Sequence, residues 1–193
     1  MAERRPHTGR RRSEEARCAI MSATLRLFTE RAATDVTVSA IAASAGVGKQ
    51  TIYRWWPSKY AILAEALSDL SASRVPQPDT GSVHKDLRRY ITATFLGAGS
   101  DEVAPLLRAL AAQAQNDRQS RSTLRAFGRD RRQALSGILR RGVERGELPA
   151  HTSVDLAVDQ VFAMLWYRLL IDDGPLSAGV ARRLTDALLK QLS

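Results

Sequence analysis

Residues 37–56 read TVSAIAASAGVGKQTIYRWW, and this stretch holds two short helical patterns separated by a glycine. Thr37 stands where the N-cap of the first helix is expected, just before an apolar stripe. Gly46 ends this helix, because glycine readily adopts the left-handed conformation found at helix C-termini. The second helix is predicted from about Lys49 to Trp55. Small alanines before the glycine let the two helices approach closely, which predicts a helix-turn-helix.

The second predicted helix carries an unusual number of hydrogen-bond donors and flat rings on its outward side. A short exposed helix of this composition suits the major groove of DNA, where side chains contact base edges and phosphates. Short helix-turn-helix segments also occur in proteins that do not bind DNA. The motif by itself therefore does not decide between a DNA-binding role and a purely structural one. The candidate DNA-contacting residues on this helix are Lys49, Gln50, Thr51, Tyr53, Arg54 and Trp55.

The distribution of charge favours a nucleic-acid partner for the N-terminal part of the chain. The whole sequence has a formal net charge of +9, from 29 Lys and Arg and 20 Asp and Glu. Residues 1–60 hold 11 basic and 5 acidic residues, whereas residues 61–193 hold 18 and 15. The excess of positive charge therefore lies beside the helix-turn-helix, as expected where a protein meets phosphate. Basic surfaces are also common without a ligand, so charge supports this hypothesis without deciding it.

Apolar periodicity elsewhere predicts an all-α fold. Residues 1–12 lack this periodicity and are interpreted as a flexible basic arm, whose Arg10, Arg11 and Arg12 are candidates for minor-groove contacts or for counterion release. Ser13 is the expected N-cap of a helix that ends near Ala33. Further helices are predicted at about 58–72, 83–97, 102–115, 118–145, 153–172 and 177–191, with a possible kink at Phe127–Gly128 in the long one. We divide the chain into the arm (1–12), a DNA-binding domain (13–58) and a larger domain for ligand binding and dimerisation (59–193).

Several classes of protein are disfavoured. Cys18 is the single cysteine, so an intrachain disulfide is impossible and a reducing, cytoplasmic location is expected. The most apolar late stretch, residues 156–171, is interrupted by polar and charged residues, which argues against a membrane span. The three histidines, at positions 7, 84 and 151, show no metal-ligand spacing, and no phosphate-binding glycine loop is present. We therefore predict no metal, no cofactor and no enzymatic activity.

The segment GVGKQTIYRWWPSK, residues 46–59, followed by Ala61-Ile62-Leu63, resembles the signature of TetR/AcrR-type transcriptional regulators. The preceding ATDVTVSAIA, residues 33–42, is similar as well, and the resemblance covers roughly residues 13–70. Around residues 145–148, 156–159 and 167–170 the chain is similar to one common class of TetR C-terminal ligand-binding domains. The resemblance implies a homodimer that binds a palindromic operator on double-stranded DNA.

The resemblance also implies individual roles. Lys49, Gln50 and Thr51 begin the recognition helix and are expected to contact bases. Phosphate contacts are expected from Tyr53 and Lys59, and Thr37 can donate to the sugar-phosphate chain. Arg54 and Trp55 are expected to face the groove. Trp56 takes the place of an aromatic residue that is usually buried, so core packing is favoured over DNA contact.

The larger domain is expected to supply the dimer interface and an effector pocket. Apolar stripes on its last two helices are candidate interface residues, although each stripe could instead face its own subunit's core: Val158, Phe162, Leu165, Leu169, Leu184, Leu188 and Leu192. A small-molecule pocket is expected among the middle helices, although plain core packing is an alternative for each member: Phe95, Leu106, Leu110, Phe127, Leu135, Phe162 and Trp166, with Gln113, Arg131 and Tyr167 as polar contacts.

The sequence thus predicts a transcriptional regulator, most simply a repressor released from its operator by a small molecule. In that mechanism the effector prefers the conformation with misplaced recognition helices, and the helix near residues 58–72 transmits the change. Two other hypotheses are a small-molecule sensor or carrier that binds no operator, and an enzyme on a helical scaffold. The basic and hydroxyl residues of the second short helix argue against the first of these.

Overall fold

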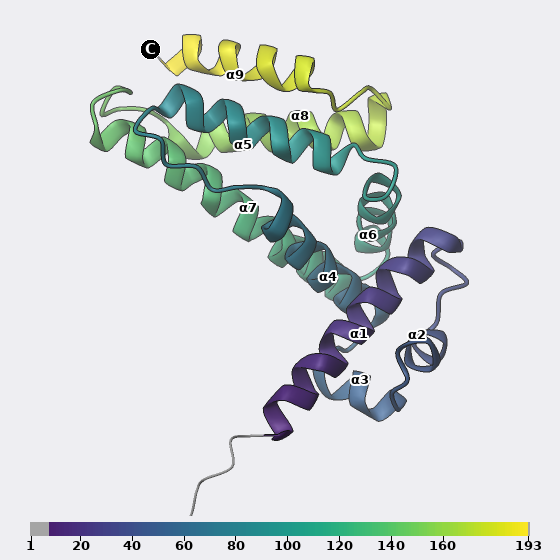
Figure 1. The fold of residues 1–193 in the computed structure, drawn as a ribbon. Helices are drawn as coiled ribbons and strands as arrows, with labels where there is room; N and C mark the ends of the chain where they lie inside the picture. The colour runs from purple at the N-terminus through teal and green to yellow at the C-terminus, as the bar shows by residue number, and fades with distance from the viewer. Residues whose placement is uncertain (1–7, 193) are drawn as a thin grey trace, which may run out of the picture. The chain divides into compact units, whose positions relative to one another are not determined.

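The computed structural model describes residues 8–192, with side chains from Ser13 onward. Within this range the fold is all-α, as predicted, and the structure has no strand (Figure 1). The helices are α1 (Thr8–Glu30), α2 (Val38–Ala45), α3 (Lys49–Trp55), α4 (Lys59–Arg74), α5 (Val83–Ala98), α6 (Ala104–Asn116), α7 (Arg118–Glu144), α8 (Val154–Tyr167), a π-helical turn η1 (Arg168–Asp172) and α9 (Ala178–Leu192). None of the helices in the described range is long and apolar enough to cross a membrane.

The chain forms two compact units, and their boundary lies inside α4, between Leu67 and Ser68. In the first unit α2 packs on α1, and α3 packs on α2. The apolar core of this unit includes Ile20 of α1, Ile41 of α2 and Ile52 of α3, each with no exposed surface. Burying such side chains is the main term that holds the short helices α2 and α3 against α1, because helices of their length are marginal in isolation.

The predicted start of α1 is wrong. We expected Ser13 to cap this helix, but α1 begins at Thr8 and Ser13 lies within it. Arginine is a good helix former, so the run of three arginines at positions 10–12 extends the helix despite the unfavourable Gly9. The remainder of the expected arm, residues 1–7, and the side chains of Arg10, Arg11 and Arg12 lie outside the described residues.

In the second unit α5 packs against α9 and α7, and α8 packs along α7 (Figure 1). The core side of α7 carries Leu135 and Leu139, which have no exposed surface. Tyr90 of α5 lies fully buried against this helix and donates a 2.7 Å hydrogen bond to the backbone carbonyl of Arg131. Burial raises the pKa of the Tyr90 hydroxyl to about 12, so it stays protonated and keeps this bond at physiological pH. The helix α7 runs without interruption across Phe127–Gly128, from Arg118 to Glu144.

The apolar stripes of α8 and α9 face the core of their own subunit. Val158, Leu165 and Leu169 are each less than 5% exposed, and so is Leu188 of α9. Residues enclosed in this way have little surface left for a partner subunit, and the interface indicated by the sequence pattern stays a prediction. Phe162 is also buried, and Leu184 and Leu192 are half-buried. The physical reason is that α8 needs its apolar side to pack on α7, and α9 needs its apolar side to pack on α5.

Two glycines of α7 differ in their surroundings and give a matched test of the packing. A Cβ at Gly142 would lie 2.7 Å from Cγ2 of Val83, whereas a Cβ at Gly128 would meet no atom within 4 Å. We expect Gly142→Ala to lower the free energy of unfolding by about 1–3 kcal/mol through overpacking. Gly128→Ala should raise it by about 0.5–1 kcal/mol, because alanine favours the helix and nothing opposes it. Urea titrations monitored by circular dichroism measure both, and equal effects would contradict this packing.

Candidate nucleic-acid interface

The turn between α2 and α3 is built by local hydrogen bonds, as the sequence predicted. The side-chain oxygen of Thr37 accepts a 3.1 Å bond from the backbone N–H of Ala40, which caps α2. Gly46 has φ +66° and ψ +31°, the left-handed conformation. The backbone N–H of Val47 then reaches the carbonyl of Ala42 at 3.0 Å and satisfies the end of α2. These bonds set the direction in which α3 leaves the turn.

The outward side of α3 is exposed, and it carries the residues predicted to contact DNA. Tyr53 is 58% exposed, and Trp55 is also exposed, which is unusual for large aromatic side chains. Ile52, just before Tyr53 in the sequence, has no exposed surface and anchors the helix to the core. Lys49, Gln50 and Arg54 are exposed beside the aromatic residues, and Thr51 is half-buried. The structure therefore brings this set together on one exposed helix.

The C-terminal end of α3 is fixed by a buried tryptophan and a carboxylate. Trp56 is only 4% exposed, which confirms the prediction that it packs in the core. Its indole Nε1 donates a 2.6 Å hydrogen bond to Oε2 of Glu65 on α4. The other carboxylate oxygen, Oε1, accepts a 2.7 Å bond from Nε of Arg17 on α1. One carboxylate thus connects α1, α4 and the end of the exposed helix.

Sequence reasoning missed Glu65 and Arg17. They are 48 residues apart, and neither belongs to a local motif. The sequence signal for these two residues is Trp56, because a buried indole N–H needs an acceptor. An acidic residue on the next helix is a candidate for that acceptor.

Lys59 is engaged within the first unit. Its ammonium donates 2.6 Å hydrogen bonds to the carbonyls of Ala33 and Val36, in the segment that leads into α2. It also lies 5.2 Å from the ring centroid of Tyr60 and 5.9 Å from that of Phe28. Desolvation lowers the pKa of Lys59, and the nearby Asp35 partly offsets this. The ammonium group of Lys59 has one N–H left that could bond to a phosphate. The expected phosphate contact therefore stays a prediction.

Comparison with known proteins identifies the family. Residues 20–66 match the family model described as bacterial regulatory proteins, tetR family. Residues 77–188 match the model described as Tetracyclin repressor-like, C-terminal domain. The chain belongs to the TetR family. It is therefore a DNA-binding transcriptional regulator of the helix-turn-helix type.

Similar proteins support this assignment of the TetR-family chain along most of its length. It is 34% identical over 166 residues to an uncharacterized HTH-type transcriptional regulator, YdeS, of Bacillus subtilis, covering 84% of this chain and 82% of YdeS. The HTH-type transcriptional regulator AqdR of Rhodococcus erythropolis is 32% identical over 155 residues, covering 79% and 74%. Among solved structures, the TetR family transcription regulator SCO0332 has a TM-score of 0.80 and 28% identity, over 93% of this chain and 99% of that one.

The residues expected to line an interior ligand pocket differ in how far they are buried. Phe95, Leu106 and Leu110 are fully or almost fully buried in the core, and so is Leu135. Arg131 is buried too, whereas Tyr167 is exposed on the surface. Phe127, Gln113 and Trp166 are half-buried.

Two of the predicted pocket residues do line a hollow. Phe162 and Trp166 surround a surface pocket of about 260 Å³ together with Gly128, Arg132, Asp159 and Ala163. This hollow lies between α7 and α8, and the full set of expected pocket residues stays a prediction. In the described part of the chain no cluster of three or more potential metal ligands occurs.

The Trp56–Glu65 hydrogen bond gives a test of how α3 is anchored. Trp56→Phe keeps an aromatic ring but removes the donor, so Glu65 loses one partner. We expect the free energy of unfolding to fall by about 1–3 kcal/mol, from the lost bond and the smaller ring. Trp55→Phe, at the exposed neighbouring position, should stay within about 0.5 kcal/mol of wild type. Denaturant titration by circular dichroism checks the pair, and the anchor assignment is wrong if both variants match wild type.

Proposed function

We propose that this TetR-family regulator is a repressor that binds a palindromic operator as a homodimer and is released by a small-molecule effector. The observation that carries the proposal is the exposed face of α3, with Tyr53 and Trp55 facing solvent on a helix fixed through Ile52 and Trp56. A folded protein seldom leaves two large aromatic residues on a seven-residue helix without a partner. Among the relatives, a protein of Mycobacteroides abscessus at 28% identity is called a DNA-binding transcriptional repressor.

The proposed contacts divide into base and backbone contacts. Lys49, Gln50 and Thr51, at the start of α3, contact base edges in the major groove. Tyr53 and the hydroxyl of Thr37 donate to phosphate oxygens, and these contacts fix the register without choosing the sequence. The remaining proposed contacts are Arg54 and Trp55 in the groove, Lys59 on phosphate, and Arg10, Arg11 and Arg12 on the DNA backbone or in the minor groove.

Variants of α3 distinguish these two kinds of contact. Tyr53→Phe should weaken binding to every sequence by about 2- to 13-fold, as expected for one lost hydrogen bond of about 0.5–1.5 kcal/mol. Gln50→Ala should reduce the preference for one base position by about 1–3 kcal/mol and leave non-specific binding almost unchanged. Selection from random duplexes, followed by fluorescence anisotropy at several salt concentrations, measures both effects. If wild-type protein selects no duplex, operator binding is refuted and a sensor or carrier without operator becomes the better reading.

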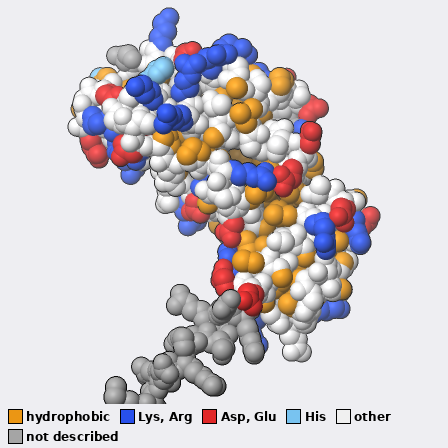
Figure 2. All heavy atoms as spheres, viewed as in Figure 1, with side chains coloured by type: hydrophobic (Ala, Val, Ile, Leu, Met, Phe, Trp, Pro, Cys, Tyr) orange, Lys and Arg blue, Asp and Glu red, His pale blue; other side chains and the backbone are white. Residues whose placement is uncertain are grey.

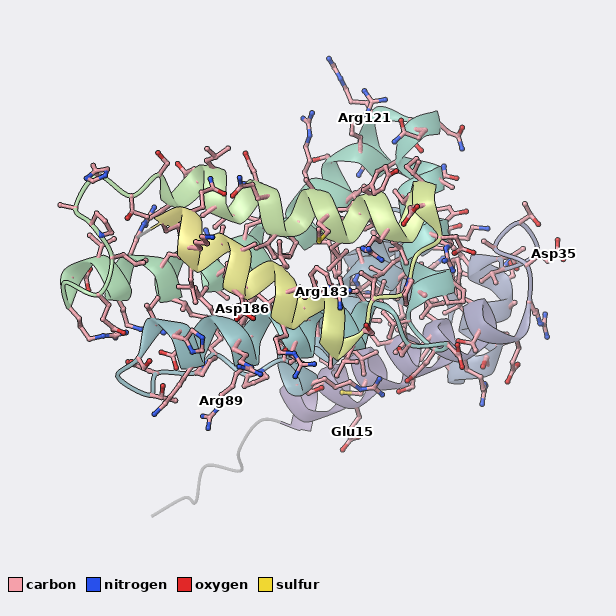
Figure 3. All side chains as sticks on the ribbon, turned by 90° about the horizontal axis from the view of Figure 1, so that it is seen from above. Glu15, Asp35, Arg89, Arg121, Arg183 and Asp186 are labelled. Carbon is pink, nitrogen blue, oxygen red and sulfur yellow. The ribbon has the colours of Figure 1, made fainter. Side chains whose placement is uncertain are left out.

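The dimer surface is proposed to be the outer side of α8 and η1. Four large apolar side chains are exposed there: Leu156, Tyr167, Leu170 and Ile171. Ile171 is 73% exposed, and exposed apolar groups that follow one another along a helix mark interaction sites. This set replaces the buried stripe that the sequence indicated. In Figure 3, which views the second unit from above, α8 and α9 lie next to each other on the near side, and Gln160 of α8 donates to Gln191 of α9 at 3.1 Å.

A pair of leucines tests this surface. Leu170, on η1, is 44% exposed, and Leu96, on α5, is 49% exposed. Leu170→Glu should convert the protein to a monomer in sedimentation velocity, because it places a charge in an apolar interface. It should also weaken operator binding, since two half-sites then bind independently. Leu96→Glu should remain dimeric. A dimeric Leu170→Glu protein, or a monomeric Leu96→Glu protein, would contradict the proposed surface.

The effector is proposed to bind the second unit at the hollow that contains Phe162 and Trp166. Its aromatic and small side chains suit an apolar group, with Arg132 and Asp159 at its edge. A solved structure with the same fold, at TM-score 0.71 and 20% identity, is titled as a FadR regulator of Bacillus subtilis in complex with stearoyl-CoA. That complex supports the proposal that this fold accommodates a small-molecule ligand.

A further inference from the structure

Positive charge in the second unit is concentrated on α7. This helix of 27 residues carries eight arginines and only two acidic residues, Asp130 and Glu144, a net charge of +6. Residues 68–193 as a whole carry 18 basic and 14 acidic residues, a net charge of +4. The rest of the unit is therefore slightly acidic, and the arginines of α7 are a local feature. This charge lies outside the helix-turn-helix unit, so DNA contacts by α3 do not account for it.

Several of these arginines surround an open groove of about 730 Å³. Its charged lining is Arg125, Arg129, Arg132 and Arg140 of α7, with Asp155 of α8. The remaining lining residues are small or neutral: Gly128, Gln133, Ser136 and Gly137. Arg132 pairs with Asp159. Within the described residues, Arg125, Arg129 and Arg140 form no ion pair, so their guanidinium groups are available to a ligand.

This groove adjoins the aromatic hollow between α7 and α8. The two share Gly128 and Arg132, so the arginine-lined groove continues directly into the pocket formed by Phe162, Ala163 and Trp166. Gly128 leaves open space at the junction, where a Cβ would meet no atom within 4 Å. A molecule lying along both would place one end among guanidinium groups and the other against aromatic rings.

We infer that this composite site binds a phosphorylated small molecule with an apolar chain or ring. Guanidinium groups form paired, charge-assisted hydrogen bonds to phosphate oxygens, and three unpaired arginines favour a ligand with more than one negative charge. Contacts in the aromatic pocket favour a ligand with an apolar part over an inorganic phosphate ion. The inference rests on the proposed effector function and specifies the chemistry of its ligand.

The same stretch of α7 also contacts α4. Arg131, between the groove residues Arg129 and Arg132, points the other way and is buried. Its Nη1 donates a 3.3 Å hydrogen bond to the carbonyl of Ser71 in the last turns of α4. Since α4 continues into the helix-turn-helix unit, a ligand that shifts α7 acts on the segment that joins the two units. This gives the site a direct physical connection to DNA binding through one helix.

Isothermal titration with matched probes tests the chemistry. Farnesyl diphosphate and octanoyl-coenzyme A combine phosphate with an apolar chain. Inorganic pyrophosphate carries only the phosphate part, and farnesol carries only the apolar part. We expect at least one of the combined probes to bind at least tenfold more tightly than either half. Trp166→Ala should reduce this difference for the diphosphate, because it removes contact with the chain. The inference is overturned if neither combined probe binds, or if a half binds equally well.

A charge-reversed pair locates the site. The double variant Arg125→Glu/Arg129→Glu should weaken binding of the combined probe at least tenfold. A second basic cluster lies over α5 and α9, where Arg89 and Arg183 are labelled in Figure 3 and basic side chains gather in Figure 2. The matched control Arg182→Glu/Arg183→Glu changes the same charge on exposed residues of α9 and should bind the probe like wild type. Equal losses in both variants would show general charge attraction and overturn the assignment.

Operator binding separates this inference from the proposed function. In the absence of probe, the Arg125→Glu/Arg129→Glu protein should bind operator DNA within twofold of wild type, and saturating probe should release wild type but not the variant. If the variant binds operator more weakly than wild type in the absence of probe, the groove arginines themselves support DNA binding. The inference then fails. If wild type binds operator but no probe binds, the inference fails while the repressor function stands. If wild type binds probe but no operator, the repressor function fails.

Discussion

The carboxylate of Glu65 holds together the part of this protein that meets DNA. A helix of seven residues such as α3 is not stable by itself, because its few internal hydrogen bonds do not offset the entropy of ordering the chain. It persists because Ile52 is buried and because Trp56, at its end, bonds to Glu65, which also holds Arg17. The anchored side uses apolar burial and one charged hydrogen-bond network. The opposite side is thereby left free to carry donors and aromatic rings.

Lys59 shows how the first unit uses charged groups for internal support. Its two bonds to the carbonyls of Ala33 and Val36 lie just before Thr37, so they fix the chain where α2 begins. Together with the Thr37 cap and the left-handed Gly46, they define α2 at both ends. The position of α3 therefore depends on backbone polar groups that are satisfied by side chains from other segments. This support preorganises the surface proposed to bind DNA, which reduces the entropy that binding must offset.

The second unit combines an apolar interior with a sharply localised charge. Its buried core includes side chains of α5, α6 and α7, and one surface hollow lies between α7 and α8. The same helix, α7, packs its leucines inward, holds α4 through Arg131 and exposes a row of arginines. One element thus takes part in the core, in the connection to α4 and in the charged groove. In the proposed mechanism, a small molecule bound to α7 therefore acts on the core and on α4 through the same helix.

The sequence by itself determined the all-α class, the turn after α2 and the buried Trp56, because capping, glycine conformation and 3.6-residue periodicity act over a few neighbouring residues. The start of α1 was not among them. The sequence also placed the residues proposed to contact DNA on α3, since the helix and its buried Ile52 are set by a local pattern. Only the tertiary structure decided that Glu65 joins Arg17 to Trp56, and that Lys59 bonds to carbonyls more than twenty residues away. It also decided that Val158, Leu165 and Leu188 face their own core. An apolar stripe has the same pattern whether its partner is the same subunit or another, so its partner is fixed by how the helices pack.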